Sequence, residues 1–338
     1  MAERVNIAVD AMGGDNAPGE IVKGAVDAVN GSPIVKVFLV GKEDLVRTEL
    51  SKYTYDPDRI EVVNATEVIE MSEPPVMAVR TKKDSSLVKC MYMVKEGKCY
   101  ALVTAGSTGA FLVGGQIIVG RIKGVERPPL APFIPTTEGR CLLLDCGANV
   151  DARPSQLVQF AKIGSAYAKK ACGIANPRVG IVNIGAEEEK GNALVKETFP
   201  LLKSTPEINF IGSVEARDIP YGAADVVVCE AFVGNVILKM YEGVGTALLK
   251  SVKEAMMSTG RSKIGALLAK PALKKELVKF DTDRYGGAPL LGCNGLLVKT
   301  HGSSKAISIT NSINQCKLFA EQNINDDIRE MFNISTDI

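Results

Sequence analysis

Short runs of consecutive apolar residues alternate along the chain with segments whose apolar residues recur every three or four positions. Each run predicts a strand, and its continuous apolarity indicates burial on both faces of a parallel sheet. The predicted strands are residues 5–10, 35–40, 60–63, 100–104, 141–145, 178–184, 208–211 and 225–229. Helical periodicity between them includes residues 18–29 and 154–171. This alternation predicts an α/β fold with a three-layer α/β/α, doubly wound, mostly parallel sheet.

No repeat, low-complexity tract or linker rich in Pro and Ser interrupts the pattern, so residues 1–338 are predicted to form a single domain. Within it, residues 258–284 are predicted to project as an amphipathic helical hairpin. Apolar residues have helical spacing over residues 261–280, and Pro271 interrupts them, which favours two short helices. Six cations flank the apolar set: Arg261, Lys263, Lys270, Lys274, Lys275 and Lys279.

The composition narrows the class of protein. With 46% hydrophobic and 23% charged residues, the chain is typical of a globular protein and unlike a disordered or fibrous one. The 40 Lys and Arg residues nearly balance the 39 Asp and Glu residues, so no global positive field exists and nucleic acid is not an expected partner. The 8 cysteines form no CxxC pair and are too dilute for a disulfide scaffold, which favours a reducing cytoplasm.

Neither a targeting segment nor a membrane-spanning segment is expected. The N-terminus runs directly into a predicted strand, without a basic region followed by a hydrophobic stretch. Residues 100–120 are the longest uncharged stretch, but glycines at positions 106, 109, 114, 115 and 120 weaken a spanning interpretation.

Five predicted strands end in loops that combine glycine with polar side chains. These loops lie at the edge of the sheet where open α/β proteins bind ligands. They contain Asp10, Gly13 and Gly14 after the first strand, Thr104, Gly106, Ser107, Thr108 and Gly109 after the fourth, Asp145 and Asn149 after the fifth, and residues 183–192 and 230–235 after the sixth and eighth. Residues 104–110 are the best predicted phosphate cradle, because small residues let backbone N–H groups and hydroxyls approach an anion. For any single loop, a tight turn that needs glycine is the alternative.

The sequence gives only weak indications of nucleotide binding, catalysis by histidine or metal binding. No GxGxxG follows the first strand and no GxxxxGK[ST] occurs, so the expected anion is small and no cofactor is expected. His301, the single histidine, fits a structural hydrogen bond near the start of the last long helix as well as it fits catalysis. Glu187, Glu188 and Glu189 could bind a metal ion, but an acidic first helical turn explains them better, so no metal site is expected.

Six separated motifs resemble those of the bacterial phosphate acyltransferase family, usually called PlsX. In chain order they are DAMGGDNAP, TAGSTGA, DCGAN, NIGAEEEKGN, VEARDIPYGAADVVVCEAFVGNV and GGAPLLGCNGLLVKTHGSS, and they span nearly the whole sequence. The resemblance implies an enzyme that converts acyl-[acyl carrier protein] and inorganic phosphate to acyl phosphate and free carrier protein, at the entry to phospholipid synthesis. It also implies a fold similar to phosphotransacetylases and isocitrate/isopropylmalate dehydrogenases. The chain departs from the family pattern at five positions: Ser107, usually Asn, Ala216, usually Gly, Glu230, usually Asp, Ala231, usually Gly, and Val233, usually Thr.

The implied reaction needs no activated serine or strong base, because phosphate is itself a nucleophile and a thioester has a good leaving group. Positioning and charge stabilisation suffice. Within the matching motifs, Lys190 and Asn235 are the implied catalytic pair, an ammonium for phosphate or the departing thiolate and an amide donor for the oxyanion. A solvated lysine and a helix-capping asparagine are the alternatives. His301 is placed at the rim of the pocket.

The resemblance implies a homodimer whose partners are acyl carrier protein and inorganic phosphate. It also implies a cytoplasmic enzyme attached peripherally to the membrane, in contact with the membrane glycerol-phosphate acyltransferase. A basic, apolar hairpin suits both an acidic carrier and an anionic membrane, whereas the alternative is a hairpin packed on the dimer partner. Rival functions are a phosphotransacetylase-like enzyme using acyl-CoA, a dehydrogenase, and a non-catalytic, membrane-associated scaffold that binds carrier protein.

Overall fold

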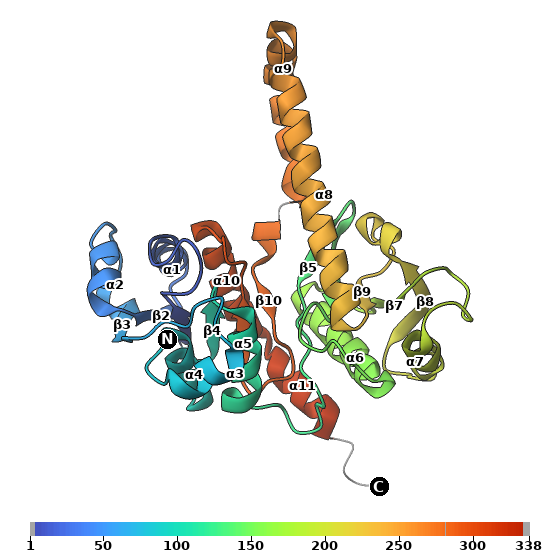
Figure 1. Ribbon diagram of the computed structural model, residues 1–338, viewed down its shortest axis with the longest axis horizontal. Helices are drawn as coiled ribbons and strands as arrows, with labels where there is room; N and C mark the ends of the chain where they lie inside the picture. The colour runs from blue at the N-terminus through green and yellow to red at the C-terminus, as the bar shows by residue number, and fades with distance from the viewer. Residues whose placement is uncertain (1–3, 281, 334–338) are drawn as a thin grey trace. The chain divides into compact units, whose positions relative to one another are not determined.

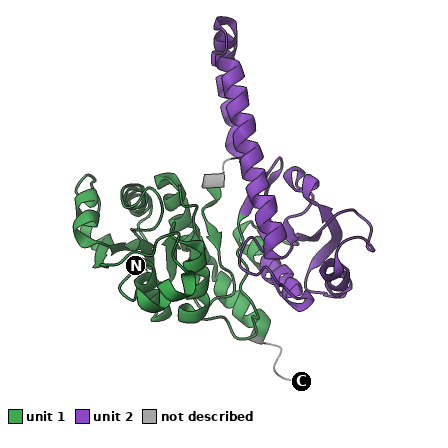
Figure 2. Ribbon diagram, viewed as in Figure 1, with its two compact units in different colours: residues 1–132, 166–175, 283–338 green, residues 133–165, 176–282 purple. Residues whose placement is uncertain are grey.

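The computed structural model describes residues 4–280 and 282–333 of the chain, and their contacts form two compact units (Figure 2). Unit 1 comprises residues 1–132, 166–175 and 283–338, and unit 2 comprises residues 133–165 and 176–282. Each unit has a sheet of its own. Because the chain passes between the units several times, no single linker separates them, and the sequence therefore carries no boundary signal.

Unit 1 is built on a six-stranded sheet in the order β10-β11-β4-β1-β2-β3 (Figure 1). The strands are β1 (Val5–Asp10), β2 (Val35–Gly41), β3 (Ile60–Asn64), β4 (Ala101–Thr104), β10 (Ala288–Pro289) and β11 (Leu296–Lys299). All neighbours are parallel except β10 and β11. The chain passes outward from β1 to β3 and then returns to the other side of β1 with β4. This reversal places the topological switch point, where such sheets bind ligands, between β1 and β4.

Helices cover both faces of the unit 1 sheet, with α1 and α10 on one side and α4 and α5 on the other (Figure 1). The helices are α1 (Gly19–Gly31), α2 (Glu43–Leu50), α3 (Pro75–Thr81), α4 (Ser86–Lys95), α5 (Thr108–Gly114), α10 (Ala306–Gln322) and α11 (Ile324–Asn333), with shorter turns η1 (Pro57–Arg59) and η2 (Gly115–Val119). The close approach of α1 to α10 requires Gly24, because a Cβ atom there would lie 2.5 Å from the Ala306 carbonyl oxygen.

Unit 2 contains a five-stranded sheet in the order β5-β6-β9-β7-β8. Its strands are β5 (Phe133–Thr136), β6 (Gly139–Leu144), β7 (Arg178–Asn183), β8 (Asn209–Glu215) and β9 (Val226–Val228), parallel except for the β5–β6 pair. Its helical segments include α7 (Ala193–Lys203), η3 (Ala216–Tyr221), α8 (Ala231–Met257), α9 (Gly260–Leu277) and η4 (Val278–Phe280). Two further segments, α6 (Pro154–Ala171) and η5 (Thr282–Tyr285), each begin in unit 2 and end in unit 1.

The predicted α/β class with mostly parallel strands is confirmed. Each of the eight predicted strands overlaps an observed one. The strands differ from the expectation in forming two sheets instead of one. Three strands, β5, β10 and β11, were not predicted; β10 is very short, and β5 contains Pro135.

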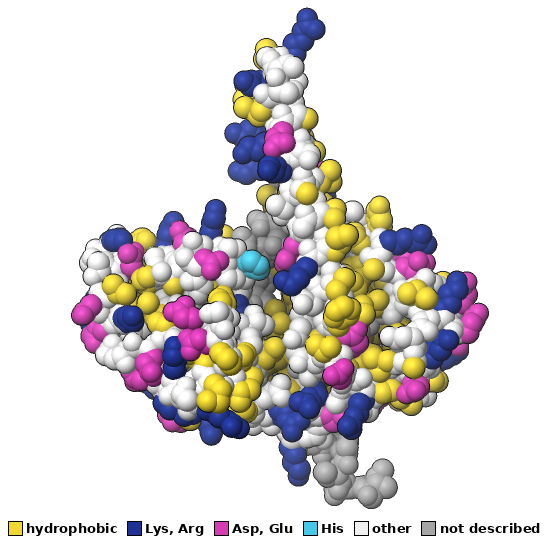
Figure 3. Space-filling model, viewed as in Figure 1, with side chains coloured by type: hydrophobic (Ala, Val, Ile, Leu, Met, Phe, Trp, Pro, Cys, Tyr) yellow, Lys and Arg dark blue, Asp and Glu magenta, His cyan; other side chains and the backbone are white. Residues whose placement is uncertain are grey.

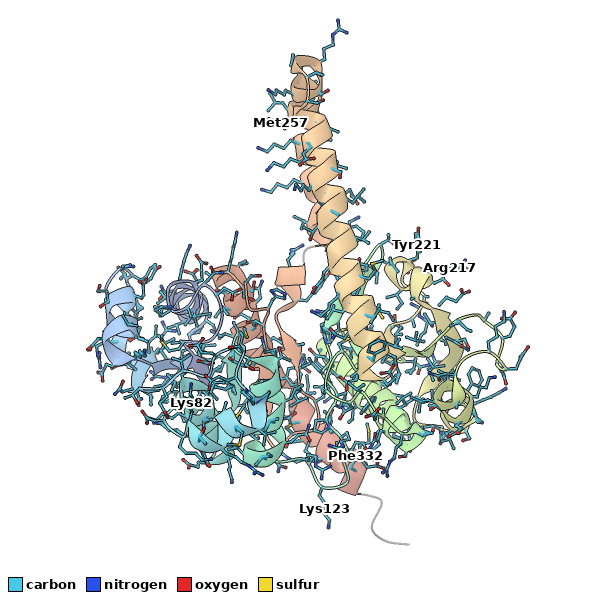
Figure 4. The ribbon with its side chains drawn as sticks, in the orientation of Figure 1. Lys82, Lys123, Arg217, Tyr221, Met257 and Phe332 are labelled. Carbon is cyan, nitrogen blue, oxygen red and sulfur yellow. The ribbon has the colours of Figure 1, made fainter. Side chains whose placement is uncertain are left out.

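Unit 2 carries a helical arm, residues 242–280, in which no described residue is buried. The first turns of α8 pack on the sheet, where Ala231 and Gly234 are buried. Beyond them α8 and α9 pack against each other as a hairpin that extends away from the unit 2 sheet (Figure 1). Met257, at the far end of α8, is 54% exposed (Figure 4).

The prediction of two short helices broken at Pro271 is wrong, because α9 is one continuous helix from Gly260 to Leu277. A proline inside a helix costs ~3 kcal/mol through a lost hydrogen bond and a steric conflict. Here the flanking residues are mainly Ala, Leu and Lys, which favour helix, and α9 packs against α8. Solvent reaches the helix at exposed Pro271, so water can hydrate the carbonyl group that loses its partner.

Candidate functional site

The centre of the unit 1 site is a buried hydrogen-bonded pair at the carboxyl ends of β1 and β4. The Thr104 hydroxyl donates to Asp10 Oδ2 at 2.7 Å and accepts from the Gly106 backbone N–H at 2.9 Å. Desolvation raises the pKa of Asp10, against the opposing effects of hydrogen bonds from Ser86, Thr104 and Met12 and the charge of Lys299. The pair therefore fixes the start of the loop that follows β4.

Glycines let the loops after β1 and β4 meet at this pair. A Cβ atom on Gly13 would lie 2.5 Å from Asp10 Oδ2 and 2.7 Å from the Gly106 nitrogen, so no larger residue fits there. Gly14 has φ +98°, a conformation that favours glycine, and a Cβ on it would lie 2.8 Å from the Gly302 oxygen. The predicted residues Asp10, Gly13, Gly14, Thr104 and Gly106 are thus brought together in unit 1.

A third loop, after β11, completes this edge. The Asp15 N–H donates to the Gly302 carbonyl at 2.8 Å, and the Thr300 N–H donates to the Thr104 carbonyl at 2.8 Å. Lys299 ends β11, is only 8% exposed, and donates a short hydrogen bond from Nζ to the Thr300 carbonyl. Burial lowers the pKa of Lys299 to about 8, although the charges of Asp10 and Asp15 oppose the change.

Lys299 was not among the predicted site residues. The sequence feature that could have indicated Lys299 is its place as a single cation at the end of the apolar run Leu296–Val298, directly before Thr300 and His301. A lysine is seldom buried without a partner or a function. A buried ammonium group at the edge where three loops meet would be stabilised by an anion, and its perturbed pKa marks it as a candidate site residue.

His301 lies in the β11–α10 loop of unit 1 and is exposed. Its Nδ1 atom accepts from the Ser303 backbone N–H at 3.3 Å and lies 2.8 Å from the Ser303 hydroxyl. This local hydrogen bonding supports the structural alternative, and a catalytic role for His301 stays a prediction.

The remaining predicted residues of the β4 loop have identifiable packing roles. Ser107 caps α5 by accepting from the Ala110 N–H at 3.4 Å. A Cβ atom on Gly109 would lie 2.4 Å from Pro75 Cγ, so this glycine permits the contact with α3. Thr108 is exposed in the first turn of α5. Phosphate binding by these three residues stays a prediction.

In unit 2, Asp145 and Asn149 form a tight turn after β6. Asp145 Oδ2 accepts from both the backbone N–H and the side-chain Nδ2 of Asn149, each at 2.7 Å. The Asn149 carbonyl accepts from the Ala231 N–H at 3.1 Å, and a Cβ atom on Gly234 would lie 1.9 Å from the Asp145 carbonyl oxygen. Asp145 is fully buried, so the turn first serves to seat the N-terminus of α8. Phosphate binding by the pair stays a prediction.

Lys190 lies in the loop between β7 and α7, where its ammonium group forms a 2.7 Å ion pair with Glu187. The hydrogen bond to Glu187 raises the pKa of Lys190, which keeps it cationic. The neighbouring Glu188 pairs with Lys203 at 2.7 Å. The interpretation of residues 187–189 as a first helical turn is wrong, because α7 begins at Ala193 with Asn192 as its cap.

Asn235 lies in the second turn of α8 and is half-buried. It does not cap the helix, because Glu230 does so by accepting from the N–H groups of Phe232 and Val233 at 2.6 and 3.0 Å. This removes the helix-capping alternative for Asn235 and leaves its amide for another role. Glu230 occupies the position of an Asp in the family pattern, and its longer side chain still reaches the backbone.

Among the described residues, no group of three His, Cys, Asp or Glu side chains could hold a metal ion. Within the same part of the chain, no helix is long and apolar enough to cross a membrane.

Comparison with known proteins identifies the family. A family model described as "Fatty acid synthesis protein" matches residues 5–327. The phosphate acyltransferase of Clostridium beijerinckii is 50% identical over 329 residues, which cover 97% of this chain and 99% of the relative. That of Clostridium botulinum is 49% identical over the same coverage. The chain belongs to the phosphate acyltransferase family. It is therefore an enzyme, and the predicted membership is confirmed.

The fold is shared with phosphotransacetylases. A phosphotransacetylase from Streptococcus pyogenes matches with a TM-score of 0.62 at 18% identity, covering 95% of each chain. The EutD phosphotransacetylase from Staphylococcus aureus matches with a TM-score of 0.59 at 18% identity, covering 93% of this chain and 94% of that one. At this identity the likeness concerns the fold alone, and the predicted relation to phosphotransacetylase folds is confirmed.

Proposed function

We propose that this phosphate acyltransferase transfers the acyl group of acyl-[acyl carrier protein] to inorganic phosphate, giving acyl phosphate and free carrier protein for phospholipid synthesis. The observation that carries the proposal is the edge of unit 1 where Thr104, Gly106 and the buried Lys299 meet. Small residues and a buried cation together favour a compact anion such as phosphate. Family membership favours an acyl donor.

In this proposal phosphate binds at the carboxyl ends of β1, β4 and β11. The Asp10 carboxylate would repel phosphate if exposed, but it is buried and serves to orient the Thr104 hydroxyl. Backbone N–H groups of the β4 loop and the Lys299 ammonium would neutralise the anion. Phosphate needs no general base of high strength, because its oxygen is already nucleophilic near neutral pH.

Lys190 and Asn235 are the proposed catalytic residues of unit 2. The Asn235 amide would donate to the thioester oxygen as it becomes an oxyanion, and the Lys190 ammonium would stabilise the departing thiolate. The ion pair with Glu187 supports the second role, since it keeps Lys190 charged.

The experiment that tests the function is phosphate-dependent loss of the thioester from acyl carrier protein loaded with a fatty acyl group. We expect acyl phosphate to form only when protein, donor and phosphate are all present. Equal or faster reaction with acyl-CoA would instead favour a phosphotransacetylase-like enzyme. Carrier-protein binding without thioester loss would favour a scaffold.

We further propose that the helical arm mediates association. Beyond its first turns, α8 exposes apolar side chains every four residues, at Met240, Val244, Leu248 and Val252. Figure 3 shows hydrophobic side chains along the exposed side of the long helix, with Lys and Arg side chains gathered toward the end of the arm. An exposed apolar stripe that winds along α8 in this way favours burial against a second copy of the chain, giving a homodimer.

The end of the arm supports peripheral attachment of a cytoplasmic enzyme to the membrane. Ile264, Leu267 and Leu268 are 64%, 70% and 78% exposed on α9, and Arg261 and Lys263 lie beside them. Apolar side chains flanked by cations favour an anionic lipid surface. Attachment there would bring the product to the membrane glycerol-phosphate acyltransferase that consumes it. The exposed cations Lys274 and Lys275 would bind the acidic carrier protein.

A further inference from the structure

Unit 2 contains an apolar pocket of about 310 Å³ at the carboxyl ends of β7 and β9. Its deep wall is formed by Leu157 and Ile181, which are at most 1% exposed, and its sides by Leu194, Val195, Val233 and Ile237. Its volume lies at the lower end of the range for small-molecule sites, roughly 300 to 1,000 Å³. A concave apolar surface of this kind binds an apolar ligand.

The polar side chains that line the pocket are committed elsewhere. Asn183 donates from Nδ2 to the Lys190 carbonyl and the Ser213 hydroxyl, and its Oδ1 accepts from the Ile184 N–H. Asn192 caps α7, and Glu230 caps α8. A ligand rich in amide or hydroxyl groups, such as a phosphopantetheine arm, would lose its hydrogen bonds to water here without replacement. A hydrocarbon chain forms no hydrogen bonds with water, so it loses none on entering the pocket.

The rim of the pocket is formed in part by the two segments that hold the proposed catalytic residues. Ile184 and Gly191, at the two ends of the loop that holds Lys190, both line the pocket. The first turns of α8, which hold Asn235, form the opposite wall through Phe232, Val233 and Val236. Ile184 is 79% exposed at this rim, so an apolar surface continues from the deep wall to the mouth.

We propose that this pocket binds the acyl chain of the donor, with Leu194 and Val233 limiting how much of the chain it accepts. The inference rests on the proposed function, and it adds the site that distinguishes donors by chain length. Val233 presents an apolar side chain to the pocket between those of Phe232 and Val236. Each methylene buried in such a pocket contributes to binding, so long chains should gain most.

Leu194→Trp tests the proposal, because it fills the pocket from the side of α7. We expect kcat/KM for dodecanoyl-carrier protein to fall at least about tenfold, equivalent to about 1.4 kcal/mol, while butanoyl-carrier protein changes by less than about twofold. Leu201→Trp is the matched control, since Leu201 lies on the same helix, is 43% exposed and does not line the pocket. If the tryptophan variant fails to fold, Leu194→Phe adds less volume and should show the same selectivity in smaller measure.

Two outcomes would overturn the proposal: equal losses with both donors, or no loss with either, in a folded variant of an active enzyme. An inactive wild type would instead refute the proposed function. Calorimetric titration with sodium dodecanoate tests the pocket separately from turnover. We expect binding to wild type and to Leu201→Trp, and its loss in Leu194→Trp; wild type that binds no dodecanoate, or Leu194→Trp that binds it as tightly, would also overturn the proposal.

Discussion

Asp10 and Thr104, 94 positions apart in the sequence, are joined by a 2.7 Å hydrogen bond from the Thr104 hydroxyl to the Asp10 carboxylate. They end two adjacent parallel strands, β1 and β4, between which the direction of the chain reverses. The same hydroxyl accepts the Gly106 N–H, so one threonine links the buried carboxylate to the loop proposed to hold phosphate. Removal of the Thr104 hydroxyl should therefore affect both the stability of the fold and the binding of phosphate.

Thr104→Val keeps the shape of the side chain and removes the hydroxyl. A buried carboxylate and a backbone N–H would each lose a partner, so we expect the free energy of unfolding to fall by about 1 to 3 kcal/mol. The KM for phosphate should rise about tenfold and that for the acyl donor should change little. Thermal unfolding and steady-state kinetics measure these effects.

Thr48→Val on α2 is the control, since the Thr48 hydroxyl bonds only the Asp44 carbonyl on the surface of the same unit among the contacts described. It should leave both KM values unchanged. A Thr104→Val enzyme with normal phosphate KM would move the phosphate site away from this loop.

Lys299 gives a pH dependence with opposite signs for stability and for phosphate affinity. Its pKa of about 8 lies below the ordinary 10.5, so between these values the folded chain binds fewer protons than the unfolded chain. Stability from this group should therefore increase as pH rises from about 8 toward 10.5. The ammonium that attracts phosphate is lost over the same interval, so the KM for phosphate should rise.

The comparison uses Lys299→Arg, whose guanidinium stays charged throughout. Between pH ~7 and ~9 we expect the phosphate KM of wild type to rise about tenfold relative to that of the arginine variant, a ratio that cancels the ionisation of phosphate itself. Lys299→Met should abolish the stability change above pH ~8, as measured by denaturant unfolding. Parallel pH profiles in wild type and Lys299→Arg would exclude this lysine from phosphate binding.

The sequence predicted the local elements of this fold better than their long-range arrangement. Buried strands such as Val5–Asp10 are visible because consecutive apolar residues can hardly be satisfied otherwise. Two sheets instead of one could not be predicted, because strand order depends on contacts between residues as distant as Leu296 and Ala101. Pro271 misled the prediction because local propensity ignores the support that α8 gives α9.

The candidate site was also predicted only in part, because some of its features depend on long-range packing. Glycine-rich loops indicated Asp10 and Thr104, since polar residues after buried strands collect at one edge of a sheet. The burial of Lys299 depends on the packing of three loops and leaves only a weak trace in the sequence. Glu230 as the cap of α8 was not predicted, because Ser, Thr, Asp and Asn are the residues preferred at this position of a helix.

Lys190→Ala and Asn235→Ala should each lower kcat about 100-fold, the usual cost of one preorganised donor to a developing charge. Both variants should fold, because Lys190 is exposed and Asn235 is half-buried on a helix that favours alanine. Lys203→Ala is the matched control, because Lys203 forms a similar surface ion pair with Glu188. Turnover near that of wild type in either variant would remove that residue from the catalytic pair.

Leu267→Glu combined with Leu268→Glu should abolish flotation with anionic phospholipid vesicles and spare turnover with soluble substrates. The two leucines are exposed on α9, so the change places charge where apolar contact with lipid is proposed and disturbs no core. Leu45→Glu with Leu201→Glu makes the same change at exposed leucines outside the arm and should float normally. Undiminished flotation of the Leu267/Leu268 variant would refute membrane contact at this part of α9.

Lys274→Glu combined with Lys275→Glu reverses charge in the last turns of α9 and should weaken carrier-protein binding. Each exposed ion pair at a protein interface acts mainly on the association rate, so we expect a slower on-rate and a several-fold higher Kd, both more evident at low salt. Surface plasmon resonance with acyl carrier protein at two salt concentrations measures this. Lys42→Glu with Lys95→Glu, exposed on unit 1, is the charge-matched control. If both double variants bind the carrier equally well, α9 does not dock it, and the cations of the arm serve the membrane or the solvent alone.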